Sequence, residues 1–209
     1  MRTCEPSALM TRRGFMGQAL LVGAALALGK SHVAAVAPTD LLHETFNGLL
    51  AFILPGSDAY SIAQGVSTID RGGVDTGVIE VFIATLDDTT PFVPNFSAQV
   101  AAILNGLAQA IDATPGGPFV SPFANLTFAE KAVVFQAMDA NPQFAPLAGV
   151  LPPFVAFLCY SESGTFDPQT RTLTGQPLGW QLCQYQGVSN GRAEFRGYFQ
   201  NRSACGNNH

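Results

Sequence analysis

Residues 41–56, LLHETFNGLLAFILPG, carry the pattern that decides the fold class. Apolar side chains recur there at three- and four-residue steps, which is the spacing of one face of an α-helix. Thr39 or Asp40 can cap the start of this helix, and Pro55-Gly56 ends it. The pattern predicts an amphipathic helix that packs one face on the rest of the protein. The residues of that face are Leu41, Leu42, Phe46, Leu49, Leu50, Ile53 and Leu54.

Helical spacing returns in residues 78–86 and 98–111. The clearest start signal is Thr127-Phe128-Ala129-Glu130, a capping box that opens a helix through about Met138. Residues 144–160 are apolar and contain Pro152-Pro153, so we expect two helical pieces with a kink. Residues 56–77, rich in Gly, Ser, Asp and Thr, predict a long loop. The sequence therefore predicts a single, mostly α domain with long loops and little sheet.

The composition changes after Tyr160. Residues 161–209 hold seven glycines, four arginines and few aliphatic side chains, so they cannot build a core of their own. We expect an irregular C-terminal arm that either wraps the helical body of residues 36–160 or contacts a partner. Trp, Tyr and Arg dominate the binding energy of many interfaces. The predicted partner-contact residues are Trp180, Tyr185, Arg192, Phe195, Arg196 and Tyr198.

The N-terminus has the features of an export leader. Thr11-Arg12-Arg13-Gly14-Phe15-Met16 precedes the apolar residues 19–28, and Arg12, Arg13 and Phe15 match the twin-arginine signal. That route carries folded proteins to the periplasm or the extracellular space. The apolar run is shorter than the roughly 20 residues that cross a bilayer as a helix, so we expect a removable leader of residues 1–35 and no membrane span in the mature chain. A general secretory signal is the alternative, and cleavage after Ala37 is a second possibility.

The predicted mature chain is acidic and poor in charge. The leader takes four of the ten basic residues and one of the fifteen acidic residues, which leaves six and fourteen and a net charge of −8. Nucleic acid is therefore a poor partner, because binding phosphates requires clustered cations. Only 12% of the whole chain is charged, against about 25% in typical globular proteins. Such a surface is typical of proteins that are partly covered by another protein.

Three cysteines remain after the leader, namely Cys159, Cys183 and Cys205. An exported protein meets an oxidising environment, and an odd number leaves at least one thiol free or paired with another chain. We favour a Cys183–Cys205 disulfide, which would tie the arm to the body, and expect Cys159 to be a small buried thiol. Spacing alone leaves the connectivity open.

A search for catalytic chemistry yields no site. No Gly-x-Gly-x-x-Gly follows a predicted strand, and His43 has the position of a surface residue on a helix. Asp58, Asp70 and Asp75 share one loop and could bind calcium, but their spacing matches no standard calcium loop, so a solvated acidic loop is the favoured interpretation. We therefore predict no catalytic residue, metal or cofactor on this chain.

Two short elements, Leu54-Pro55-Gly56-Ser57-Asp58 and Gln184-Tyr185-Gln186-Gly187, carry a family resemblance. They are similar to the early Ile-Pro-x-x-Asp element and the late Gly-Tyr-x-Gly element of the gluconate 2-dehydrogenase subunit 3 family. The resemblance implies a small non-catalytic subunit of a large flavoprotein dehydrogenase of the glucose–methanol–choline type, sometimes with a cytochrome. The partner would carry FAD and cross the twin-arginine translocase with this chain. The alternatives are a free-standing exported helical protein that binds a small apolar ligand or an envelope partner, and a small exported enzyme.

Overall fold

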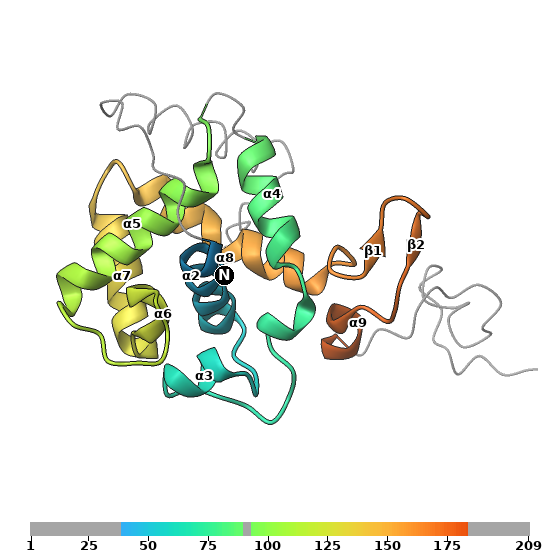
Figure 1. Cartoon of the computed structure of the whole chain (residues 1–209), viewed down its shortest axis with the longest axis horizontal. Helices are drawn as coiled ribbons and strands as arrows, with labels where there is room; N and C mark the ends of the chain where they lie inside the picture. The colour runs from blue at the N-terminus through green and yellow to red at the C-terminus, as the bar shows by residue number, and fades with distance from the viewer. Residues whose placement is uncertain (1–38, 90–92, 184–209) are drawn as a thin grey trace, which may run out of the picture.

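The computed structural model describes residues 39–89 and 93–183 (Figure 1). Within these residues the fold is a single, mostly α domain with one two-stranded hairpin, which confirms the predicted fold class. In chain order the elements are α2 Thr39–Ile53, α3 Ala59–Ala63, the 3-10 helix η1 Val74–Thr76, α4 Ile79–Thr89, α5 Phe96–Ile111, α6 Pro122–Asn125, α7 Phe128–Ala140, α8 Ala145–Tyr160, β1 Phe166–Asp167, β2 Thr172–Leu173 and α9 Leu178–Leu182.

Helix α2 is the central element, as the sequence predicted. It contacts α3, α4, α5, α6 and α8, and Figure 1 shows it in the middle of the helical body. Phe46, Leu49 and Leu50 are fully buried, which confirms the predicted apolar face. The helix ends at Ile53, just before Pro55, because a proline has no amide hydrogen to donate.

The contact between α2 and α6 depends on a glycine. A Cβ atom at Gly48 would lie 2.9 Å from the Ala124 Cα, closer than side-chain carbons approach a backbone. Gly48 therefore lets the two helices pack backbone to backbone. Phe123 and Ala124 of α6 are fully buried as a result.

The predicted helices of the body are present with small changes at their ends. The helix predicted from residue 78 is α4, and the one predicted from Ala98 begins two residues earlier, as α5. The capping box that opens α7 is formed: the Thr127 hydroxyl accepts from the Glu130 amide at 3.3 Å, and the Glu130 carboxylate accepts from the Thr127 amide at 2.8 Å.

Helix α8 is one continuous helix, so the prediction of two pieces around Pro152-Pro153 is wrong. The two prolines lack amide hydrogens and leave the carbonyls four residues earlier without a helical donor. One of those carbonyls belongs to Gly149, which is exposed, so water can satisfy it. The opposite face stays anchored in the core by Leu147, Leu151, Val155, Leu158 and Cys159.

The stretch predicted as one long loop, residues 56–77, contains α3 and η1. Both are too short to show a helical repeat in the sequence. Residues 161–183 are also more regular than their composition indicated, since β1 pairs antiparallel with β2, with Phe166 opposite Leu173. Helix α9 packs on α8 and η1, at the right-hand end of the molecule in Figure 1.

Close backbone contact holds α9 in place. A Cβ atom at Gly179 would lie 2.3 Å from the Tyr160 carbonyl oxygen, so the two backbones touch where α8 ends. Leu178 is buried beside it. The last described residues therefore belong to the folded body. Across the residues that the structure describes, no helix combines the length and apolar character needed to cross a bilayer.

Candidate functional site

The Leu54–Asp58 element, which carries part of the family resemblance, forms a tight junction after α2. The Asp58 carboxylate caps α3, accepting from the amides of Tyr60 and Ser61 at 2.9 Å each and from the Ser61 hydroxyl at 2.7 Å. The Ser61 oxygen in turn accepts from the Gly56 amide at 2.9 Å. These bonds close a small ring of polar groups, which gives Asp58 a structural role.

The same junction binds the loop that follows α3. A Cβ atom at Gly56 would lie 2.3 Å from the Gly72 amide nitrogen. The lack of side chains at these two glycines therefore lets the two backbone segments touch. The Thr68 amide donates to the Gly56 carbonyl at 2.9 Å, and the Gly73 amide to the Leu54 carbonyl at 2.8 Å. The junction therefore fixes where α3 and η1 lie against α2.

Gln64, at the end of α3, connects this junction to two other helices. Its side chain is almost fully buried, and its amide group donates to the Ala51 carbonyl of α2 at 2.9 Å. Its backbone carbonyl accepts from the Phe128 amide of α7 at 2.9 Å. Its side-chain oxygen accepts from the amine of Lys131 at 2.9 Å. Gln64 thus contacts α2 and α7 at once.

Lys131 is fully buried, although lysine is normally an exposed residue. Its amine also donates to the Gly48 carbonyl at 3.2 Å and lies 5.5 Å from the centre of the Phe123 ring. Within the described ranges no carboxylate lies within 4.0 Å of it. Burial lowers the pKa of Lys131 to about 7, and the more distant Asp58 opposes that change.

A neutral amine can act as a nucleophile or base. Lys131 has the required pKa, but its side chain is closed off from solvent, so no substrate reaches it in this structure. Its three contacts instead join α7 to α2, α3 and α6. We therefore assign Lys131 a structural role.

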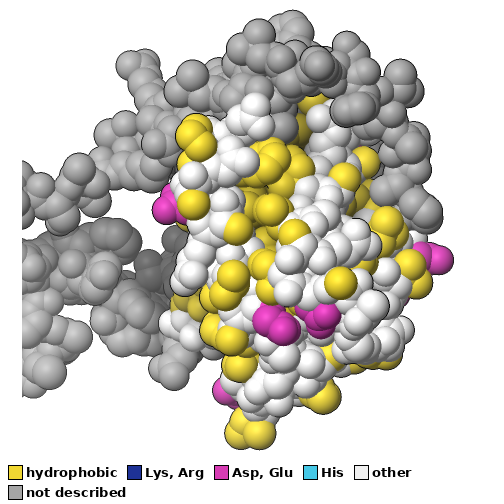
Figure 2. Space-filling model, turned by 90° about the vertical axis from the view of Figure 1, so that its left-hand side faces the viewer, with side chains coloured by type: hydrophobic (Ala, Val, Ile, Leu, Met, Phe, Trp, Pro, Cys, Tyr) yellow, Lys and Arg dark blue, Asp and Glu magenta, His cyan; other side chains and the backbone are white. Residues whose placement is uncertain are grey.

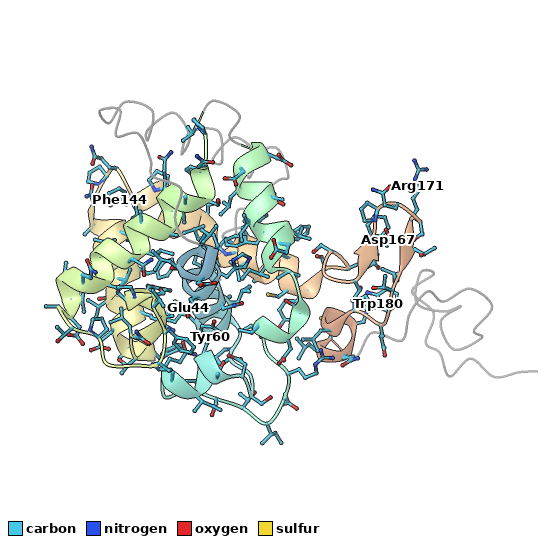
Figure 3. All side chains as sticks on the ribbon, in the orientation of Figure 1. Glu44, Tyr60, Phe144, Asp167, Arg171 and Trp180 are labelled. Carbon is cyan, nitrogen blue, oxygen red and sulfur yellow. The ribbon has the colours of Figure 1, made fainter. Side chains whose placement is uncertain are left out.

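A second buried polar cluster joins α2, α5 and α6. Asn105 donates to the Thr45 hydroxyl at 2.8 Å, and its carbonyl oxygen accepts from the Ser121 hydroxyl at 2.8 Å and from the Phe123 amide at 3.0 Å. Glu44 accepts from the Ser121 amide at 2.9 Å at the rim of the cluster. In Figure 3, the labels of Glu44 and Tyr60 show the part of the body that contains this cluster. The buried polar groups of the cluster thus satisfy one another's hydrogen bonds.

Two of the remaining candidates, His43 and Asp75, have structural partners, and Asp70 lies exposed in the loop after α3. His43 lies on α2, as predicted, partly exposed, with its Nε2 2.7 Å from a Glu80 carboxylate oxygen of α4. Asp75 accepts from the Gly72 amide at 3.0 Å. In the part of the chain that the structure describes, no three His, Cys, Asp or Glu side chains form a group that could hold a metal ion.

The thiols differ in their surroundings. Cys159 is buried, as predicted, and burial raises the pKa of its thiol to about 11. Cys183 is exposed just after α9. Cys205 lies outside the described residues, so the Cys183–Cys205 pairing stays a prediction.

Trp180 is the one predicted partner-contact residue inside the described ranges. It lies on α9 and is partly buried, at the same end of the molecule as Asp167 and Arg171 (Figure 3). The other predicted contacts, Tyr185, Arg192, Phe195, Arg196 and Tyr198, lie outside the described residues. So do the leader residues Arg12, Arg13 and Phe15.

The described body is strongly acidic at its surface. It contains thirteen acidic residues and three basic ones, of which Lys131 is buried, so that Arg71 and Arg171 are its exposed cations. Figure 2 shows one face on which apolar side chains are spread among acidic ones and no Lys or Arg is visible. A partner of this surface would meet apolar groups and carboxylates.

Sequence reasoning missed the structural role of Lys131. The buried residues of α7 are Lys131, Val134 and Met138, which lie at helical spacing. The sequence signal that could have predicted the burial of Lys131 was therefore its position on the apolar face of this helix.

Comparison with protein-family models, with curated proteins and with solved structures finds no match for this chain. Its function is therefore inferred from its own residues and their geometry.

Proposed function

We propose that this protein is an exported, non-catalytic subunit that escorts a flavin-dependent dehydrogenase of the glucose–methanol–choline type. The observation that carries the proposal is the Arg12-Arg13 leader on a chain in whose described residues the one buried ionisable amine, that of Lys131, serves packing. The partner would hold FAD, and a cytochrome subunit is a further partner that the family resemblance implies. The complex would reach the periplasm or the extracellular space.

The physical reason for an escort is the size of the cargo. A flavoprotein that has folded around its cofactor cannot pass a channel that accepts unfolded chains. The twin-arginine route accepts folded proteins, and one signal can serve a complex of two chains. This chain would supply the signal, and its partner would supply the catalytic site.

An exposed aromatic residue supports a partner contact at one end of the body. Phe166 is 47% exposed and lies on β1, which precedes α9 in the chain. Buried Trp, Tyr and Phe side chains contribute most of the binding energy in many interfaces. The predicted contact residues begin at Trp180 on α9, which packs on α8. Helix α9 therefore holds the first of the predicted contact residues at a fixed position on the body.

The test is co-expression with a flavoprotein of this type that lacks its own leader and is encoded beside this gene. We expect the two chains to co-purify and the enzyme to be exported. Replacing Arg12 and Arg13 by Lys should retain both proteins in the cytoplasm, while their binding is unchanged. Export of the enzyme without this chain, or failure of the two to bind, would contradict the proposal.

A truncation separates residues 184–209 from the part of the chain that the structure describes. Ending the chain after Cys183 keeps α9, so the body should keep its thermal unfolding temperature and lose partner binding. Ending it after Gly164 also removes buried Leu178 and should lower that temperature, which makes it the control for a structural effect.

A further inference from the structure

Helix α8 has an unusual surface for a helix that is partly exposed. None of its sixteen side chains, APLAGVLPPFVAFLCY, is charged. A helix that is apolar on all sides is normally buried on all sides. Yet four of its residues are exposed in the described body. We name them the α8 ridge: Gly149, Pro153, Phe157 and Tyr160.

The ridge lacks a side chain at Gly149, a gap that we call the notch, and carries a large exposed side chain toward its other end. A Cβ atom at Gly149 would meet no heavy atom within 4 Å, so the surface there is open. Phe157 stands out with 66% of its surface exposed. The two residues are eight positions apart, about 12 Å along a helix. Pro153 lies midway between them.

This order of small and large residues is self-complementary. If a second copy of α8 lies antiparallel with Pro153 near the twofold axis, each Phe157 faces the Gly149 notch of the other chain. One contact then buries two phenylalanines and fills two notches. We propose that the α8 ridge is a twofold interface between two copies of this protein.

Charge favours a second copy over the protein's own C-terminal segment. That segment carries Arg192, Arg196 and Arg202, and the uncharged ridge offers their guanidinium groups no carboxylate. Two acidic bodies can meet at the ridge because no charge is buried there. They still repel at longer range, so added salt should strengthen the dimer.

The first test measures the mass of residues 36–209 in solution by sedimentation velocity over a range of concentrations, with reductant present to exclude disulfide-linked dimers. We expect a reversible dimer that tightens with salt. Phe157→Asp should raise the dimer Kd by about 100-fold or more, because the contact is lost twice. Val133→Asp is the control, since Val133 is also exposed (44%) on a helix, α7, and should leave the Kd unchanged.

A second pair of variants separates dimerisation from folding. Gly149 and Gly106 both lie exposed in helices, and neither has a heavy atom near its missing Cβ. Replacing either by Leu should maintain or raise the stability of the monomer, because glycine disfavours helix. Only Gly149→Leu should abolish the dimer, because it fills the notch.

Three results would overturn the proposal. The first is a chain that stays monomeric at every concentration and salt. The second is a dimer that Gly149→Leu and Phe157→Asp leave intact. The third is a monomer that becomes a dimer only after truncation at Cys183, which would show that the C-terminal segment covers the ridge. None of these depends on the flavoprotein, so failure here is distinct from failure of the proposed function.

Discussion

Two buried polar sites hold the body together, and they do so with different chemistry. The Thr45–Asn105–Ser121 cluster joins α2 to α5 and α6 through neutral groups. The Lys131 site joins α2 to α3 and α7 through an amine that faces two carbonyl oxygens. Each connects residues far apart in the chain. Only the second contains a group that can change charge near neutral pH.

The difference shows how the cost of burying a polar group depends on whether the group is charged. In the neutral cluster each donor meets an acceptor, so burial is offset at any pH at which the protein folds. In the Lys131 site the charged form loses water without gaining a carboxylate. Protonation therefore weakens the second site and leaves the first unchanged.

The largest expected effect is in the neutral cluster. Asn105→Ala leaves the Thr45 hydroxyl without its donor, and the Ser121 hydroxyl and the Phe123 amide without their acceptor. We expect the free energy of unfolding in urea to fall by about 3 kcal/mol or more. The loss should be the same at pH 7 and pH 9. Gln109→Ala, at an exposed position of the same helix, is the control and should change stability by less than about 0.5 kcal/mol.

The next effect is the pH dependence of the Lys131 site. The pKa of Lys131 is about 7 in the folded protein and 10.5 in its ordinary state. Between these values the unfolded chain binds a proton that the folded protein does not, so stability rises with pH. From pH 7 to pH 9 we expect a gain of about 2 kcal/mol, measured by urea unfolding. In Lys131→Met this gain should be absent.

Two features sharpen that experiment. Gln64→Glu would place a carboxylate beside the amine, return the pKa of Lys131 toward its ordinary value, and so remove the gain between pH 7 and 9. Above pH 9 burial of Cys159 acts in the opposite sense, because its raised pKa makes stability fall as pH increases. An equal pH slope in the wild type and Lys131→Met would show that the amine is not the cause.

The smallest effect concerns the helix that carries Lys131. Thr127→Ala removes one side of the capping box at the start of α7, and we expect a loss of about 1 kcal/mol. Thr127→Ser should recover most of it. The pH slope should persist in both variants, since Lys131 stays buried. A slope that disappears with the cap would mean that α7 loosens as a whole.

The sequence predicted those elements that repeat the same periodicity over several turns. Helices α2, α4 and α5 follow from their apolar spacing, and α7 from its capping box. The prediction that helix α8 divides at Pro152-Pro153 was wrong. It considered the hydrogen bonds that the prolines lose and left out the buried face of the helix, which stays in contact with the core. Helix α3 has five residues, too few for a periodic signal, and only the Asp58 cap marks it.

The candidate site was harder to predict, because burial depends on residues far apart in the chain. No role was predicted for Lys131, and lysine is usually exposed. Its burial requires Gly48 and Gln64, which lie 83 and 67 residues away in the sequence. By contrast, Cys159 was correctly expected to be buried, because its own apolar neighbours are enough to indicate it.

Trypsin cleaves after Lys and Arg. Because few cations are exposed in the described body, trypsin should cut that body at few sites while it is folded. Within the described ranges the protease would find Arg71 in the loop after α3 and Arg171 in the turn between β1 and β2, while Lys131 is shielded. Cleavage after Lys131 therefore requires unfolding. The digestion pattern of the intact protein would report, from a single gel, whether the core has opened.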